Sequence, residues 1–233
     1  MFGVSILIPA FNEEQSLPQV IRETYDFLKN RSFDGEVLVL DDKSSDRTLE
    51  ILKQLQAQYR EMRFFSHPRN LGVGQALQTL GRNARKEYCF FLPADGQVKA
   101  SELDKFLPHL EGADLIVGYR KIRADSPARK ILSRIFNRIF AGIFKIPIHD
   151  ADSVFLIRKT AWEALAPRSR GAMLLGEMLV KSRKTDYTIK EVEIGHYPRS
   201  AGSAKGLSWK MVLGALGEFY QLYRENRASD NRR

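Results

Sequence analysis

The sequence has 233 residues, of which 43% are hydrophobic and 28% charged, with 16 glycines and 9 prolines. This composition excludes a collagen-like, low-complexity or largely disordered chain, and the length suits one α/β domain with a short appendage. The 37 Lys and Arg residues exceed the 28 Asp and Glu residues and give a net charge of +9, which favours anionic partners such as phosphate-bearing ligands, nucleic acid or an anionic membrane surface.

Strands and helices are expected to alternate over the first half of the chain. Short apolar runs predict strands at residues 4–9, 36–40, 62–65, 88–92 and 115–118. Apolar residues at helical spacing predict helices after Ser16, after Asp46 and from near Gly72. Strands that are apolar on both faces and separated by helices are typical of a mostly parallel sheet covered on both sides. The expected fold class is therefore α/β, with a Rossmann-like sheet flanked by helices.

The second half is expected to elaborate this sheet. A long amphipathic helix is predicted at 128–144, strands at 153–157 and 187–194, and helices at 175–184 and 207–224. A loop rich in Gly and Ser, at 200–206, precedes the last helix. We expect one domain over residues 1–206, including the amphipathic helix at about 128–145, followed by a C-terminal helix and polar tail over 207–233.

Most of the net positive charge lies in one segment. Residues 120–149 contain eight Lys or Arg residues and one acid, Asp125. Large apolar residues are interleaved with these bases on one stripe of the expected helix: Ile131, Leu132, Ile135, Phe136, Ile139, Phe140, Ile143 and Phe144. The pattern predicts a helix that lies in the headgroup region of an anionic membrane, with Phe136 and Phe140 inserted. The alternative is a helix whose stripe faces the core.

Two further features bear on location. The single cysteine, Cys89, excludes an internal disulfide framework and a cysteine-rich zinc site, and it fits a reducing compartment. The first residues lack a basic leader segment, and no apolar run approaches the roughly 20 residues of a membrane-spanning helix. We expect a cytoplasmic protein that is peripheral on the inner face of a membrane.

Polar side chains follow three of the expected strands, within residues 9–14, 41–42 and 93–97. Ligands of an open parallel sheet bind beyond the carboxyl ends of its strands, so these residues predict a site for a nucleotide and a divalent cation. The alternative is that the Asp and Asn residues only cap helices. The sequence contains no Gly-x-Gly-x-x-Gly strand-helix fingerprint, no phosphate loop ending in Gly-Lys-Ser/Thr and no Gly-x-Ser-x-Gly elbow.

Five motifs occur in the order seen in family 2 glycosyltransferases of the GT-A fold. They are PAFNE at 9–13, VLDDKSSD at 39–46, NLG at 70–72, ADGQ at 94–97 and VGYR at 117–120. Within that family the sequence most resembles polyprenyl-phosphate glycosyltransferases of the dolichyl-phosphate mannose synthase type. The segments at 191–199 and 202–205 also resemble that subgroup. The resemblance covers about residues 3–206. It implies metal-dependent, inverting transfer of a hexose from a UDP- or GDP-sugar to a polyprenyl phosphate, in cell-envelope or glycolipid biosynthesis.

The resemblance assigns roles to individual residues. Glu13 would contact the donor nucleotide, and Asp41 and Asp42 would read its base and ribose. The metal motif Asp-x-Asp-x-Gln corresponds here to residues 93–97, so Asp95 and Gln97 would ligate Mg²⁺ or Mn²⁺, with a proline in place of the first aspartate. The full set of nucleotide-sugar-binding candidates is Pro9, Phe11, Glu13, Asp41, Asp42, Asp95, Arg120, Arg199 and Lys205.

The nature of the acceptor decides whether a base is needed. A phosphate oxygen is already anionic, whereas a hydroxyl acceptor requires Asp150 or Asp152 to deprotonate it; with Asp95, these are the catalytic candidates. A soluble or macromolecular hydroxyl acceptor, or a non-catalytic nucleotide-sugar-binding protein, remains an alternative. Nucleic-acid binding is disfavoured because adjacent strands lack interleaved aromatic and basic residues. A homo-oligomer or a membrane-protein partner also stays open.

Overall fold

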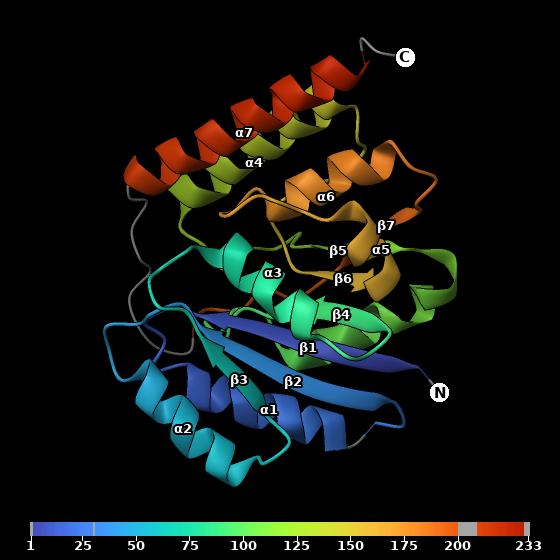
Figure 1. Cartoon of the computed structure of the whole chain (residues 1–233). Helices are drawn as coiled ribbons and strands as arrows, with labels where there is room; N and C mark the ends of the chain where they lie inside the picture. Colours follow the sequence, from blue (N-terminus) through green and yellow to red (C-terminus); the bar gives the residue numbers. More distant parts are fainter. Residues whose placement is uncertain (1, 30, 200–208, 231–233) are drawn as a thin grey trace.

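A seven-stranded sheet forms the centre of this computed structural model, which describes residues 2–29, 31–199 and 209–230 (Figure 1). The strand order is β3-β2-β1-β4-β6-β5-β7. The strands are β1 (Gly3–Ala10), β2 (Asp34–Asp41), β3 (Arg63–Ser66), β4 (Tyr88–Phe91), β5 (Leu115–Tyr119), β6 (Phe155–Arg158) and β7 (Ile189–Glu193). Each predicted strand is present, with ends that differ by a few residues at most.

Only β6 runs against the other strands of the described sheet. It is antiparallel to β4 and β5, whereas β1 pairs in parallel with β2 and β4, β2 with β3, and β5 with β7. Six strands therefore have their carboxyl ends at one edge, and the amino end of β6 lies at that same edge. The loops at this edge are the ones that carry the polar motifs.

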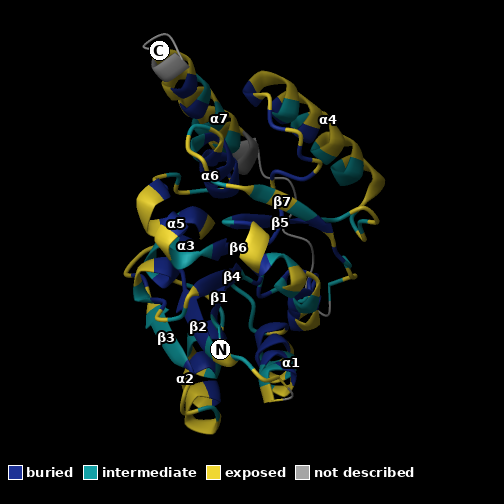
Figure 2. Ribbon diagram, turned by 90° about the vertical axis from the view of Figure 1, so that its right-hand side faces the viewer, coloured by how far each residue is buried: buried dark blue, intermediate teal, exposed yellow. Residues whose placement is uncertain are grey.

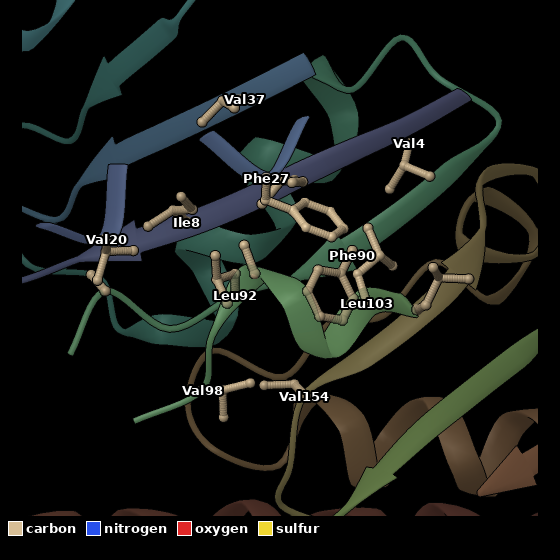
Figure 3. Packing of buried hydrophobic residues seen from close by; sticks show 14 of the residues in the cluster. Val4, Ile8, Val20, Phe27, Val37, Phe90, Leu92, Val98, Leu103 and Val154 are labelled. Carbon is tan, nitrogen blue, oxygen red and sulfur yellow. The ribbon is translucent and has the colours of Figure 1, made fainter. Parts of the chain in front are cut away.

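The sheet is covered on both faces because alternate residues of its central strands enter two separate cores. Ile6 and Ile8 of β1 belong to one core and Leu7 to the other, and all three are fully buried. The first core, with Phe27 and Phe90, is shown in Figure 3. It is covered by α1 (Leu17–Lys29), α2 (Thr48–Gln58) and the short 3₁₀ helices η1 (Ala100–Lys105) and η2 (Leu107–Gly112). The second core is covered by α3 (Val73–Asn83), α5 (Lys159–Leu165) and α6 (Leu174–Arg183).

An outer layer of two helices lies beyond α6. These are α4 (Pro127–Phe144) and α7 (Trp209–Asp230) (Figure 1). The ring of Phe219 on α7 lies 5.4 Å from Phe144 and 6.4 Å from Phe140 on α4. Phe140 also reaches Gly176 of α6, where an added Cβ would lie 3.0 Å from the Phe140 ring. Aromatic packing thus joins α4 to both neighbouring helices.

The amphipathic stripe predicted for α4 divides into two faces. Phe140 and Phe144 are fully buried in the second core, so the expectation that Phe140 inserts into a membrane is wrong. The aliphatic residues stay in solvent, with exposed fractions of 41–56% for Ile131, Leu132, Ile135, Ile139 and Ile143. On α7, Leu213, Leu216 and Tyr220 are also exposed, and Figure 2 shows both helices with long exposed stretches. We call these eight residues the apolar face.

None of the helices in the described ranges is long and apolar enough to cross a membrane.

Candidate functional site

The candidate residues come together at the edge where six strands end. Glu13 follows β1, Asp41 and Asp42 lie at the end of β2, Asp95 and Gln97 follow β4, Arg120 follows β5, Asp150 and Asp152 precede β6, and Arg199 follows β7. The strand order changes direction between β1 and β4, and open α/β sheets bind ligands at such a switch point. Lys205 lies outside the described residues.

Hydrogen bonds join the loop after β1 to the loop after β2. The Asn12 backbone, at φ 54°, donates to Ser44 Oγ at 2.8 Å, and Asn12 Oδ1 accepts from the Ser45 N–H at 2.7 Å. The Glu13 N–H donates to Thr48 Oγ1 at 2.9 Å. Glu13 Oε2 in turn accepts from Ser16 Oγ at 2.9 Å. The loop that follows Pro9 at the end of β1, which contains Phe11, is therefore held in place by the loop after β2.

Asp42 is almost fully buried and its carboxylate organises the turn before α3. Its oxygens accept from the Leu71 N–H at 2.9 Å and the Gly72 N–H at 2.8 Å, and Oδ1 lies 2.7 Å from His67 Nδ1. Gly72 has φ 91°, which disfavours other residues, and an added Cβ would lie 2.7 Å from the Arg170 carbonyl oxygen. The structure thus gives Asp42 a positioning role, and direct contact with a base stays a prediction.

Asp41 is similarly buried beneath the same edge. One carboxylate oxygen accepts from the Ser44 N–H at 3.1 Å and the other from Ser66 Oγ at 3.2 Å. Ser44 is half-buried and Ser66 is exposed, so the buried Asp41 carboxylate is bonded to two residues near the surface. The pair of acids predicted to read the nucleotide therefore sets the shape of the loops at this edge of the sheet.

The side-chain oxygens of Asp95 and Gln97 are of the type that Mg²⁺ and Mn²⁺ prefer. Asp95 Oδ1 accepts from the Gln97 N–H at 3.0 Å, and Asp95 Oδ2 lies 3.1 Å from Arg199 Nη2. The Arg199 guanidinium thus contacts the same carboxylate oxygen that would be offered to a metal ion. Among the described residues no group of three or more His, Cys, Asp or Glu side chains could hold a metal ion. The two residues fit a cation whose remaining ligands come from a diphosphate and water.

Arg120 and Asp150 form a buried bidentate ion pair. The guanidinium donates from Nε to Oδ2 at 2.8 Å and from Nη2 to Oδ1 at 2.9 Å, and Nη2 also donates to the Asp152 carbonyl oxygen. Burial works to lower the pKa of Arg120, but the hydrogen bonds and charge of Asp150 raise it above its ordinary value. Both Asp150 oxygens accept hydrogen bonds from Arg120. This carboxylate therefore holds the guanidinium in place and is poorly arranged to remove a proton from a substrate.

A cavity of about 660 Å³ lies between the segment after β5, helix α4 and residues 147–150. Six cationic residues line it: Arg120, Lys121, Arg123, Lys130, Arg134 and Arg138. Among the described residues that line the cavity, Asp150 is the one carboxylate, and it is paired with Arg120; Arg123 pairs with Asp125 and Lys121 with Glu193 outside the lining. Ile122, Ala141 and Ile148 contribute apolar surface. The cavity suits an anionic group attached to an apolar chain.

Two histidines near this cavity already have protein partners. His149 Nδ1 lies 2.6 Å from Glu191 Oε2, and its ring lies 4.9 Å from the ring of Tyr119. His196 Nδ1 accepts from the Ala124 N–H at 3.0 Å. Burial, followed by the charge of Arg120, lowers the pKa of His196 to about 4. In both rings Nδ1 is therefore engaged by a group of the protein.

No motif in the sequence indicates the contribution of α7 to this region. Glu218 accepts from the Gly171 N–H at 2.7 Å and the Arg170 N–H at 3.1 Å. The Arg170 carbonyl in turn accepts from the Gln75 N–H at 3.1 Å, at the first turn of α3. Glu218 thus links the outer helix to the turn that Asp42 holds. Helix α7 carries no motif. Glu218 meets Arg170 and Gly171, which lie 48 and 47 positions earlier in the sequence, only because the chain folds in this way.

Comparison with known proteins gives a family match over most of the chain. The model of the family described as "Glycosyl transferase family 2" matches residues 5–163. The dolichyl-phosphate beta-glucosyltransferase ALG5D of Trichomonas vaginalis is 30% identical over 152 residues, which are 60% of this chain and 45% of that protein. The putative glycosyltransferase CsbB of Bacillus subtilis is 27% identical over 170 residues, 72% of this chain and 52% of that protein. The match spans about half the length of these relatives.

A solved structure is similar over nearly the whole chain. Glucosyl-3-phosphoglycerate synthase from Mycobacterium tuberculosis, in complex with Mn²⁺, UDP and phosphoglyceric acid, superposes with a TM-score of 0.69 at 18% sequence identity. The superposition covers 97% of this chain and 76% of that one. At this level of identity the similarity concerns the fold.

Proposed function

The chain belongs to glycosyl transferase family 2, and we propose on this premise that it transfers a sugar from a UDP- or GDP-sugar to a polyprenyl phosphate at the cytoplasmic face of a membrane. One observation supports the choice of acceptor. The cavity lined by six cationic residues lies against α4, and other residues of this helix form part of the apolar face. A lipid phosphate has both an anionic group for the cavity and an apolar chain for the adjacent surface.

The donor would lie at the edge of the sheet where β1 and β4 end. Glu13, in the loop held by Thr48 and Ser16, would contact it together with Pro9 and Phe11, and Asp41 would support the neighbouring loop after β2. Asp95 and Gln97 would hold Mg²⁺ or Mn²⁺, which when bound would neutralise charge on the leaving diphosphate. Arg199, which contacts Asp95, would add a positive charge beside the same group.

The acceptor phosphate would bind beside Arg120. Its oxygen attacks the anomeric carbon of the sugar, the bond from that carbon to the nucleoside diphosphate breaks, and the diphosphate leaves with the electron pair. A single displacement of this kind inverts the configuration. A phosphate oxygen needs no general base, which agrees with the engagement of both Asp150 oxygens by Arg120. Asp150 would hold the Arg120 guanidinium in position, and the backbone carbonyl of Asp152 would accept a further hydrogen bond from it.

The apolar face would place the protein on the membrane. The exposed isoleucines of α4 alternate with Arg134 and Arg138, so insertion of the apolar side chains brings the bases to the lipid phosphates. Each base near an anionic surface contributes about 1 kcal/mol, and several together would hold a protein that inserts only the surface of two helices.

A screen of donors and acceptors tests the proposal. UDP- and GDP-sugars are incubated with undecaprenyl or dolichyl phosphate, and labelled sugar is counted in the organic extract. We expect incorporation with one nucleotide series, and we expect Arg134→Gln and Arg138→Gln to raise the KM for the lipid while the affinity for the nucleotide stays unchanged. Transfer to soluble hydroxyl acceptors alone, or donor binding without any transfer, would contradict the proposal and support one of the two alternatives.

A further inference from the structure

We propose that Arg199 is an internal counter-ion of Asp95, which a divalent cation can displace only when a nucleoside diphosphate takes up the freed guanidinium. The cation and the nucleotide would therefore bind together and not independently. This inference rests on the proposed function for the presence of a cation and a nucleotide, and it adds a specific role for one residue in ordering their entry.

The ion pair occupies the carboxylate oxygen that a cation needs. Asp95 Oδ1 already accepts from the Gln97 N–H at 3.0 Å, and Oδ2 is the oxygen that contacts Arg199, at 3.1 Å. Only 16% of the Asp95 side chain and 19% of the Arg199 side chain are exposed. Pro93 stands where the resembling family has a second carboxylate. The guanidinium and a divalent cation thus compete for one oxygen of one carboxylate.

The guanidinium is incompletely satisfied in this pair. Arg199 Nε is buried and has no hydrogen-bond partner among the residues that the structure describes. A buried N–H without an acceptor is unfavourable, so it marks a position where a ligand oxygen would be accommodated. Arginine binds phosphate groups with two parallel hydrogen bonds. A diphosphate would therefore offer Arg199 an acceptor for Nε that Asp95 does not provide.

The chain before Arg199 is anchored at the loop that contains Asp95. The Tyr197 N–H donates to the Gln97 carbonyl at 2.8 Å, and the Gly195 N–H donates to Glu102 Oε2 at 2.8 Å. Tyr197 Oη donates to Glu102 Oε1 at 3.1 Å. Because these bonds end two residues before Arg199, its guanidinium can change partner while the anchor stays in place.

Competition at Asp95 has a thermodynamic consequence that binding experiments can measure. Any nucleotide that draws Arg199 away strengthens cation binding, and by reciprocity the cation strengthens nucleotide binding by the same factor. Removing the guanidinium removes the competitor, so cation binding to the free protein tightens. The same change weakens nucleotide binding because a diphosphate contact is lost.

The test is a titration of free Mn²⁺ by electron paramagnetic resonance, with and without UDP, and with GDP in parallel. For the unaltered protein we expect weak Mn²⁺ binding that the nucleotide tightens by about tenfold or more. Arg199→Gln should bind Mn²⁺ alone about fivefold more tightly than the unaltered protein. The factor by which the nucleotide increases Mn²⁺ affinity should be smaller in this variant by a similar amount. Arg199→Lys, which keeps the charge, should retain weak binding of Mn²⁺ alone.

Two control variants make the outcome specific. Lys86→Gln removes the same charge at the opposite edge of the sheet, where Lys86 Nζ pairs with Asp34 Oδ2 at 2.5 Å, and it should leave Mn²⁺ affinity unchanged. Asp95→Asn should abolish Mn²⁺ binding with or without nucleotide. If Arg199→Gln binds Mn²⁺ no more tightly than Lys86→Gln does, the proposal is wrong. These titrations need no acceptor, so failure to glycosylate a polyprenyl phosphate leaves their result intact.

Discussion

Single residues at the sheet edge have more than one partner each, and this is why the sequence alone could not assign all their roles. The motifs correctly placed Asp41, Asp42, Asp95 and Arg120 at strand ends. Motif spacing cannot show that Asp42 accepts from the Leu71 and Gly72 N–H groups or that Arg199 contacts Asp95. Those contacts join segments about 30 to 100 positions apart in the sequence and exist only once the sheet has formed.

At Asp95 we predict that activity requires a divalent cation. Asp95→Asn should lower turnover by about 10² or more, because a ligand and the neutralisation of the diphosphate are both lost. Steady-state rates with Mg²⁺ or Mn²⁺ measure the effect. Pro93→Asp is the companion variant and should tighten cation binding without creating a new activity. Full activity in excess EDTA would refute the requirement.

At His196 we predict a pH-dependent contribution to stability. Burial lowers the pKa of His196 to about 4 in the folded protein, against 6.5 without such burial, so the unfolded chain binds the proton first as the pH falls. The contribution is present above pH 6.5 and is lost as the pH falls towards 4. Urea unfolding at pH 7 and pH 5 should show a larger loss for the unaltered protein than for His196→Asn, which keeps an acceptor for the Ala124 N–H. Equal losses would mean that His196 is not the group responsible.

At the scale of elements, apolar runs predicted the strands and helical spacing predicted the long helices. The pattern of each of these elements follows directly from which of its own residues are buried against the sheet or the helices beside it. They missed η1, η2 and α5, which have six or seven residues each and too few turns to show a period. They also gave no sign that β6 is antiparallel, since a strand buried on both faces has the same composition in either direction. The buried face of α4 depends on Phe219, which lies on a helix far along the chain.

The two faces of α4 give a prediction with a matched control. Ile135→Ser with Ile139→Ser should release the protein from anionic vesicles and leave its melting temperature nearly unchanged, because both side chains are exposed. Phe140→Ser should instead cost about 3–5 kcal/mol of folding free energy, since its ring is fully buried. Co-sedimentation and thermal unfolding separate the two effects. Unchanged co-sedimentation of the isoleucine variant would exclude the apolar face as the membrane contact.

At the scale of the whole molecule, the expected fold is confirmed: a mostly parallel α/β sheet of the GT-A type in a chain that belongs to glycosyl transferase family 2. The arrangement places the candidate nucleotide-binding residues at one edge of the sheet and a cation-lined cavity between the segment after β5 and α4. The exposed apolar side chains of α4, which lines this cavity, and those of α7 belong to the outer helical layer (Figure 1). Donor, acceptor phosphate and lipid chain would each meet a surface of matching chemistry.

The acceptor headgroup is the most direct test of this account. The protein is incubated with the donor nucleotide-sugar and, in separate reactions, with a polyprenyl phosphate or the free polyprenol of the same chain length, and the lipid products are identified by mass spectrometry. We predict a sugar joined through phosphate to the lipid in the first reaction and no glycosylated lipid in the second. Equal glycosylation of the free polyprenol would show that a hydroxyl is the acceptor and would contradict the role given to the cation-lined cavity.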